Sequence, residues 1–330
     1  MSLAKGIGYA ASFEQFHPTD LLTWSQQAEQ QGFFGVMASD HFHPWVPSQG
    51  QSAFVWSWMG ALGAVTNLRF GTGVTPPGYR YHPAILAQAA ATLEAMYPGR
   101  FYLGLGAGEA LNEHITGEYW PEAPTRLERL SESIEIIQKL FTGKVIKHKG
   151  AHFNVESAKL YTLPDAPPPI YVATSGPINA KRTGKTTDGI ILVGAADDKL
   201  KMLLDRFAEG AREAGKNPDE MPKIIQFKVS IAGTEDEAIA QAIKEWPNGG
   251  MAFAKGDIRN PEDFESMAKL VKAEHYKNRV LTDPNLDNHV KQIQHYVDLG
   301  FNEIYVHNVG RNQAEFIDLY GKHVIPNIKF

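Results

Sequence analysis

The sequence predicts an α/β fold in which the whole chain, residues 1–330, forms one (β/α)8 barrel, or TIM barrel, with insertions. Short apolar segments alternate with segments of helical periodicity, and such alternation requires parallel strands joined by crossover helices. Eight strand segments can be recognised, which is the number that closes this kind of barrel. A doubly wound dinucleotide-binding sheet is disfavoured, because no Gly-x-Gly-x-x-Gly motif follows the first strand segment.

The first half of the chain contains four strand segments and four helical segments. The strand segments share a brief, mostly apolar run, which is typical of parallel strands buried on both faces. They lie near residues 7, 36, 70 and 103. The helical segments share apolar residues at intervals of three or four. They span residues 20–31, 54–65, 83–96 and 126–141.

The second half continues the alternation after an inserted hairpin, which is predicted because residues 144–155 alternate in polarity around Gly150. The later strand segments lie near residues 171, 191, 228 and 304. The later helical segments begin at about residue 177 and then span residues 199–214, 235–246, 289–299 and 313–320. Residues 247–287 are irregular and polar, so we expect an insertion in the barrel there and not a second domain.

Composition and charge exclude several classes of function. Lys and Arg total 32 against 37 Asp and Glu, and the net charge of −5 disfavours binding to nucleic acid or to an anionic membrane. No apolar run approaches the ~20 residues of a membrane span. The absence of Cys excludes disulfides, thiolate metal sites and a cysteine nucleophile, and fits a reducing cytoplasm. The 12 His residues lack the spacing of metal ligands, so we expect no metal.

The residues that follow each strand segment are the candidates for function, because the active site of a (β/α)8 barrel lies at the carboxyl ends of its strands. After the second strand, Asp40, His41 and Trp45 fall within six residues. Histidine suits acid–base chemistry near neutral pH, and an indole can line the site of a planar ligand. The alternative is a capping Asp next to surface histidines.

Three later segments carry further candidates. After the third strand, the Gly and Pro residues of 73–81 permit a backbone that approaches a ligand closely, or form a plain turn. After the fourth strand, residues 104–113 hold three glycines and Glu109, which is either solvated or a carboxyl whose pKa is raised by burial. After the fifth strand, residues 174–177 open a helix whose N–H groups could bind an anion, unless Ser175 caps them.

Four motifs together resemble the luciferase-like superfamily, and more closely its deazaflavin-dependent dehydrogenases, which use coenzyme F420. The motifs are Ser39-Asp40-His41-Phe42-His43-Pro44-Trp45, Arg80-Tyr81-His82-Pro83, Met96-Tyr97-Pro98-Gly99-Arg100 and Gly106-Ala107-Gly108-Glu109-Ala110-Leu111-Asn112-Glu113. The resemblance runs over nearly the whole chain. It implies a luciferase-like barrel, a homodimer, and hydride transfer to F420 from a secondary alcohol or a sugar phosphate, as in the glucose-6-phosphate and secondary-alcohol dehydrogenases.

The resemblance also implies roles for individual residues. His41 would take the hydroxyl proton of the substrate, Glu109 would protonate the deazaflavin, and Trp45 would pack beside the reacting carbons. Glu14 would be a second carboxylate near the substrate. The cofactor would be bound by Asp40, Gly73, Val74, Pro76, Ala107, Asn112, Ser175, Gly176, Ile178 and Asn179. The Gly73–Val74 position matches a bulge of the family that often has a non-prolyl cis bond. Apart from the resemblance, three basic side chains either attract an anionic cofactor tail or are simply solvated, namely Arg80, Lys181 and Arg182.

The substrate positions depart from the glucose-6-phosphate enzymes. Where those enzymes grip the substrate phosphate with a Thr and a Lys, this chain has Val193 and Ala196. Two basic positions are kept, Lys255 and either Lys277 or Arg279. Each lost charge-assisted bond is worth ~1.5–3 kcal/mol, so another sugar phosphate or an uncharged secondary alcohol is as good a candidate as glucose 6-phosphate. Two other functions stay open, an FMN-dependent monooxygenase of the same superfamily and a non-catalytic ligand-binding barrel.

Overall fold

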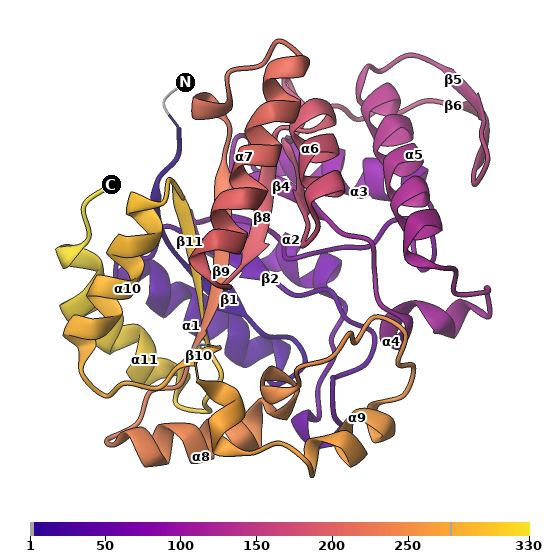
Figure 1. Cartoon of the computed structure of the whole chain (residues 1–330). Coiled ribbons are helices and arrows are strands. Elements are labelled where there is room, and N and C mark those ends of the chain that lie inside the picture. Colours follow the sequence, from indigo (N-terminus) through magenta and orange to yellow (C-terminus); the bar gives the residue numbers. More distant parts are fainter. Residues whose placement is uncertain (1–2, 278) are drawn as a thin grey trace.

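The computed structural model of the protein describes residues 3–277 and 279–330 and shows a closed barrel of parallel strands surrounded by helices (Figure 1). Neighbouring strands pair in parallel, and the pairing of β8 with β9 closes the ring. The barrel strands are β1 (Gly6–Ala11), β2 (Gly35–Ala38), β3 (Arg69–Thr72), β4 (Phe101–Leu105), β7 (Ile170–Ala173), β8 (Gly189–Val193), β9 (Lys223–Val229) and β11 (Glu303–Asn308). All eight predicted strands and the predicted fold class are confirmed.

The side chains of the barrel strands alternate between the interior of the barrel and the surrounding helices. On β9, Ile224 belongs to the core inside the barrel, whereas Ile225 and Phe227 belong to the core between the barrel and its helices. The same alternation places Gln226 and Lys228 on the interior side, nearer the carboxyl end of the strand.

The amino end of the barrel is filled by a group of side chains that we call the barrel floor. Tyr102 and Tyr305 are completely buried there, and the guanidinium of Arg69 lies 5.3 Å from the centre of the Tyr102 ring. Nε of Arg69 is also 3.5 Å from Oε2 of the buried Glu303. A glycine makes room for one ring, because a Cβ atom at Gly8 would lie 2.2 Å from the ring of Tyr305.

Helices cover the outside of the barrel. They are α1 (Pro18–Gln30), α2 (Val55–Val65), α3 (Pro83–Met96), α4 (Ala110–Glu113), α5 (Ala123–Phe141), α6 (Pro177–Thr186), α7 (Asp197–Glu213), α8 (Glu235–Glu245), α9 (Pro261–Ala268), α10 (Leu286–Asp298) and α11 (Gln313–Leu319). Four predicted helices, α1, α5, α7 and α10, start earlier than expected. Prolines occupy the first turns of α1 and α5, where a missing N–H costs nothing, and the Asn285 side chain caps α10. Each helix of the described residues is too short or too polar to span a membrane.

Two segments extend from the barrel. The predicted hairpin is confirmed by the antiparallel pair β5 (Ile146–Lys149) and β6 (Asn154–Ala158). The expectation that residues 247–287 are irregular is wrong in part, because the segment contains α9 and the two-residue strand β10 (Val280–Leu281), which pairs with β9 outside the closed ring. The polar sequence hides α9 because the helix is anchored mainly by one completely buried side chain, Phe264.

Candidate active site

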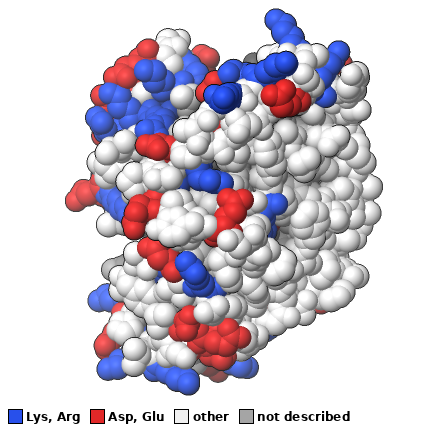
Figure 2. Space-filling model, turned by 90° about the vertical axis from the view of Figure 1, so that its right-hand side faces the viewer, with Lys and Arg blue, Asp and Glu red and all other residues white. Residues whose placement is uncertain are grey.

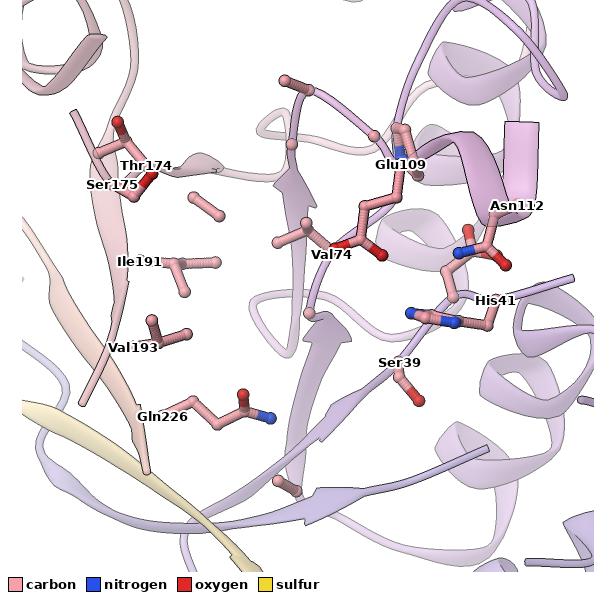
Figure 3. Close-up of a pocket in the computed structure, with 18 of the residues that line it drawn as sticks. Ser39, His41, Val74, Glu109, Asn112, Thr174, Ser175, Ile191, Val193 and Gln226 are labelled. Atoms are coloured by element: carbon pink, nitrogen blue, oxygen red, sulfur yellow. The ribbon is translucent and has the colours of Figure 1, made fainter. Parts of the chain in front are cut away.

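A cavity of ≈ 690 Å³ opens at the carboxyl ends of the barrel strands. Figure 3 shows His41 and Glu109 on one side of it and Val193 and Gln226 on the other. The cavity brings together the four predicted catalytic residues, the ten predicted cofactor-binding residues and one of the predicted substrate residues. In chain order these are Glu14, Asp40, His41, Trp45, Gly73, Val74, Pro76, Ala107, Glu109, Asn112, Ser175, Gly176, Ile178, Asn179 and Val193.

The imidazole of His41 is held in one orientation by the loop that follows β2. Its Nδ1 lies 3.1 Å from the carbonyl oxygen of His43, and its Nε2 lies 3.5 Å from Oε1 of Glu14. The loop itself is fixed by Asn112, whose Oδ1 accepts a hydrogen bond from the backbone N–H of His43 at 3.1 Å. Because a carbonyl oxygen can only accept, Nδ1 of the neutral ring carries the proton and Nε2 keeps a lone pair. His41 can therefore act as a base through Nε2, beside the ring of Trp45 at 5.2 Å.

Glu14 follows β1 and is held as an anion next to this base. Its Oε2 accepts hydrogen bonds from the hydroxyls of Ser12, at 3.0 Å, and Ser39, at 2.6 Å. Burial raises the pKa of Glu14, but the neighbouring His41 and the Ser39 hydroxyl outweigh burial, so that this pKa is lowered overall. An anionic carboxylate beside Nε2 stabilises the imidazolium that forms when His41 takes a proton.

Glu109 follows β4 and projects into the cavity from a different strand than His41 (Figure 3). It precedes α4, yet its side chain makes no capping hydrogen bond. Burial raises the pKa of Glu109, and the neighbouring His41 and Lys255 offset only part of that effect, which confirms the predicted shift. A carboxyl with a raised pKa retains its proton closer to neutral pH and can act as an acid.

A buried ion-pair network ties together the loops after β2, β3 and β4. Arg80 donates through Nη1 to Oδ1 of Asp40 at 3.1 Å and through Nε to Oε1 of Glu113 at 2.9 Å. Asp40 also accepts from the hydroxyls of Thr75, at 2.6 Å, and Tyr81, at 3.1 Å. The expectation that Arg80 attracts an anionic cofactor tail is therefore wrong, because its charge is neutralised inside the protein.

The start of α6 forms another edge of the cavity. Gly176 is its N-cap residue and no side chain caps the helix, so the alternative in which Ser175 is the cap is wrong. The N–H groups of the first turn are left for solvent or a ligand. Farther along α6, Lys181 pairs with Glu209 at 2.7 Å and Arg182 donates to the Ser131 hydroxyl of α5, and neither basic residue is among those that line the cavity.

The loop after β3 has the backbone feature that the resemblance implies. The peptide bond between Gly73 and Val74 is cis, and both residues line the cavity. Val74 packs against the loop after β4, since a Cβ atom at Gly106 would lie 2.5 Å from Cγ2 of Val74. Gly106 is therefore required for the packing of Val74, whether or not its backbone N–H also donates a hydrogen bond to a ligand.

The predicted substrate positions are only partly brought together. Val193 lines the cavity and is 53% exposed. Ala196 does not line the cavity and is the N-cap residue of α7. Lys255 is not among the lining residues either; its Nζ lies 5.9 Å from the ring of Trp45 and donates to the backbone carbonyl of Asn248. The guanidinium of Arg279 donates to a backbone carbonyl of the 247–287 segment at 2.9 Å.

Several cavity residues are missed by sequence analysis, among them Gln226, Lys228, Trp246 and His307. The signal for the first two is the alternation of β9, which turns every second residue from Ile224 onward to the barrel interior. Burial lowers the pKa of His307 to about 3, and the charge of Lys228 adds to this effect. His307 is therefore a neutral hydrogen-bonding group of the cavity wall.

The chain is similar to known proteins over its whole length. Residues 3–303 match the family described as luciferase-like monooxygenase. The F420-dependent glucose-6-phosphate dehydrogenase of Microbacterium testaceum (strain StLB037) is 37% identical, over 100% of this chain and 99% of that protein. The protein of the same name from Nakamurella multipartita (strain ATCC 700099 / DSM 44233 / CIP 104796 / JCM 9543 / NBRC 105858 / Y-104) is 36% identical, over 98% of this chain and 96% of that protein.

Solved structures agree with these matches. An F420-dependent secondary alcohol dehydrogenase in complex with an F420–acetone adduct superposes with a TM-score of 0.93 at 35% identity, over 99% of this chain and 100% of that one. A coenzyme F420-dependent tetrahydromethanopterin reductase from Methanopyrus kandleri gives a TM-score of 0.81 at 22% identity, which shows the common fold alone. The chain therefore belongs to the luciferase-like family, in which its similar relatives are named F420-dependent dehydrogenases.

Proposed function

We propose that the protein is a dehydrogenase that oxidises the CH–OH group of a secondary alcohol or a sugar phosphate, with coenzyme F420 as the hydride acceptor. One observation carries the proposal: a base, His41, and an acid, Glu109, reach into the same cavity from two different strands. Alcohol oxidation releases a hydroxyl proton together with a hydride, so it needs a base on the substrate side and a proton for the reduced cofactor. The relatives named F420-dependent dehydrogenases support the same chemistry.

The residues of the cavity fit a planar ring that carries an anionic tail. Val74 and Ile191 give the cavity apolar walls, and its volume of ≈ 690 Å³ is in the range of cofactor sites. A Cβ atom at Gly176 would have no neighbour within 4 Å, so the backbone at the uncapped start of α6 is open to a ligand. We assign the phosphate to this helix start, whose N–H groups favour an anion without a basic side chain.

The side chains would divide the proton chemistry as follows. When bound, F420 accepts a hydride from the substrate carbon. Nε2 of His41 takes the hydroxyl proton, and Glu14, 3.5 Å away, stabilises the imidazolium. Glu109 holds a proton on the other side of the cavity because burial raises its pKa. Trp45 packs beside His41 and shields the reacting atoms from water.

We also propose that two copies of the chain associate. The exposed surfaces of α2 and α3 include Val65, Ile85 and Met96, and α2 contains no charged residue. Figure 2 shows a broad area without charged side chains on one face of the molecule, beside areas where Lys and Arg are interspersed with Asp and Glu. Exposed apolar side chains that gather on one surface are a feature of protein–protein interfaces. Light scattering that gives the mass of one chain would count against the homodimer.

Location and domain organisation are proposals of the same kind. A chain without Cys is suited to the cytoplasm, and fractionation of cells that produce the protein tests this location.

We propose that residues 247–287 are an insertion within a single barrel domain, because their helix α9 packs through Phe264 against Trp45 of the cavity, with ring centres 5.3 Å apart. Separate unfolding transitions for the segment and the barrel would contradict a single domain.

The proposed activity is tested by mixing the protein with F420 and a panel of secondary alcohols and sugar phosphates, and following the visible absorbance of F420. We expect absorbance to be lost with at least one alcohol, and not when His41→Ala replaces the wild type. Unchanged absorbance across the panel, with tighter binding of FMN than of F420, would overturn the proposal in favour of a monooxygenase.

A further inference from the structure

His307 is a buried histidine of the cavity wall whose two ring nitrogens have different surroundings. It lies on β11, two residues after Tyr305 of the barrel floor, so its side chain faces the same interior and lines the cavity. Its Nε2 lies 3.0 Å from Oε1 of Gln15. Its Nδ1 has no hydrogen-bond partner among the described residues, yet it is not sealed in the protein interior, so it is open to the cavity.

Gln15 determines which of these nitrogens carries the proton. Its amide nitrogen donates to two backbone carbonyl oxygens, that of Glu245 at 3.1 Å and that of Val309 at 2.9 Å. Because carbonyl oxygens can only accept, the orientation of the amide is fixed and its oxygen is the atom that faces His307. The amide oxygen also can only accept, so Nε2 of the neutral imidazole carries the proton and Nδ1 keeps a lone pair.

The surroundings favour the neutral form of His307 and hold its ring in place. Burial lowers the pKa of His307 to about 3, and Lys228, its partner in register on β9, adds to this effect, whereas Glu14 opposes it. Trp246 packs against the imidazole edge to face, with ring centres 4.5 Å apart. Near neutral pH, Nδ1 is therefore an uncharged hydrogen-bond acceptor at a fixed place in the cavity wall.

An acceptor in this place favours one kind of ligand group. An ionised carboxylate or phosphate oxygen has no proton to donate to Nδ1, and an alkyl group would leave the lone pair without a partner, which costs free energy. A hydroxyl group can donate to it. Gln226, which Figure 3 shows projecting into the cavity from β9, likewise has an amide without a hydrogen-bond partner among the described residues. Two uncharged polar groups thus face a ligand from this wall.

We propose that His307, oriented by Gln15, is a specificity-determining residue whose Nδ1 accepts a hydrogen bond from a second hydroxyl of the substrate, beside the hydroxyl that is oxidised. The protein therefore prefers a diol or polyol over an alcohol with a single hydroxyl. The inference rests on the proposed function for the identity of the ligand as an alcohol substrate, whereas the tautomer and the open acceptor are properties of the chain itself. His307 contacts the substrate, and Gln15 is a positioning residue.

The acceptor is tested without cofactor, by nitrogen-15 NMR of the full-length protein labelled at histidine. We expect the His307 signals, identified by their absence from His307→Gln, to show a protonated Nε2 and an unprotonated Nδ1 at neutral pH. Butane-2,3-diol should shift the Nδ1 signal more than butan-2-ol, which has one hydroxyl fewer. Gln15→Met should mix the two tautomers, a change that a merely structural role of Gln15 would not produce.

The selectivity is tested by reduction of F420 with the same two alcohols. We expect the wild type to have the higher kcat/KM for the diol, and His307→Leu to lower the ratio of the two kcat/KM values about tenfold, because a hydrogen bond to the substrate is lost. His307→Gln, whose amide oxygen can accept, should keep part of the ratio. The matched control is His323→Leu, which removes an exposed histidine outside the cavity and should leave the ratio unchanged.

The outcomes separate this inference from the proposed function. A His307 ring with its proton on Nδ1, or an Nδ1 signal that responds equally to the two alcohols or to neither, overturns the acceptor; this measurement on the wild type decides if His307→Leu does not fold. An equal ratio in the wild type and His307→Leu, or an equal loss in His323→Leu, also overturns it.

Two further results distinguish the failures. Reduction of F420 by both alcohols without preference for the diol overturns the inference and leaves the dehydrogenase function standing. A shift of Nδ1 by the diol, without reduction of F420 by any alcohol of the panel, leaves the acceptor standing and removes the function.

Discussion

Two parts of the cavity wall differ in how their polar groups are satisfied. In the first, formed by the loops after β1 to β4 and called here the catalytic wall, Glu14, Asp40 and Arg80 each contact several partners within the protein. In the second, formed by β7 to β9 and the start of α6 and called here the open wall, Lys228 has no partner in the described residues and the helix has no cap.

The difference indicates two tasks. Groups that move protons must be held in position before a ligand arrives, and the network of the catalytic wall provides that order. Polar groups that bind a charged ligand form their hydrogen bonds with that ligand. This explains why the polar groups of the open wall have no hydrogen-bond partners among the described residues of the protein. We therefore expect substitutions in the catalytic wall to change rates and stability, and substitutions in the open wall to change affinity and choice of ligand.

The largest effect is expected for the proton-moving pair of the catalytic wall. Removal of a positioned acid or base typically costs ~10²–10⁴ in rate, so His41→Ala and Glu109→Gln should each reduce turnover by about two orders of magnitude or more. Cofactor affinity should change much less, because neither side chain lies at the start of α6. Steady-state rates and cofactor titrations measure both quantities, with the exposed His323→Ala as a control. Near-normal turnover in either variant would remove that residue from the mechanism.

The next effect concerns the stability of the catalytic wall. Arg80→Met leaves the buried carboxylates of Asp40 and Glu113 without their cation, and loss of one partner of a buried pair costs ~3–5 kcal/mol. We expect the free energy of unfolding to fall by about that amount in denaturant titrations, and less for Arg80→Lys. The control is Arg206→Met, which breaks a solvent-exposed pair with Glu209 worth at most ~1 kcal/mol. Equal losses at the two sites would show that the network does not order the wall.

A gain of affinity is expected from a change in the open wall. Val193→Thr combined with Ala196→Lys introduces the two polar side chains that the resemblance to the glucose-6-phosphate enzymes implies at these positions, each bond being worth ~1.5–3 kcal/mol. The KM for glucose 6-phosphate should fall about tenfold or more, while turnover changes little. Ala214→Lys adds the same charge at the exposed far end of α7 and serves as the control. A KM that does not move would mean that the phosphate binds elsewhere.

The smallest effect concerns pH. His307 stays neutral in the folded protein down to its pKa of about 3, whereas a histidine of the unfolded chain is protonated below about pH 6.5. Between these values the unfolded state binds more protons, so the folded state loses stability as the pH falls, by at most ~1.4 kcal/mol per pH unit. Denaturant titrations at pH 7 and pH 5 should show a smaller difference for His307→Gln than for the wild type. An identical difference would mean that other groups set the acid sensitivity.

The fold could be predicted from the sequence because short apolar runs and helical periods report burial directly. This signal was enough to predict all eight barrel strands. Once the barrel is recognised, the loops that follow its strands are expected to form the active site. Contacts between distant segments carry no such signal. The pairing of Arg80 with Asp40, 40 residues away, and the orientation of His41 toward Glu14 depend on how the loops meet.

The open wall was harder to predict for a different reason. The strand β9 is recognised in the sequence by its apolar residues, and Lys228 is a charged residue among them. Only the alternation of side chains along the strand indicates that Lys228 faces the interior of the barrel.

The helix α9 was not predicted because Phe264 alone makes its deepest contact, and a single apolar residue gives no helical periodicity.

The barrel floor has a consequence for the order in which molecules come and go. Buried rings and the pair of Arg69 with Glu303 close the amino end, so the cavity is reached from the carboxyl end. All molecules that use the cavity share this entrance. One that rests against Ala10 and Ile191 at its base must arrive before, and depart after, one that lies nearer the mouth. The closed end of the barrel thus makes exchange a sequential process.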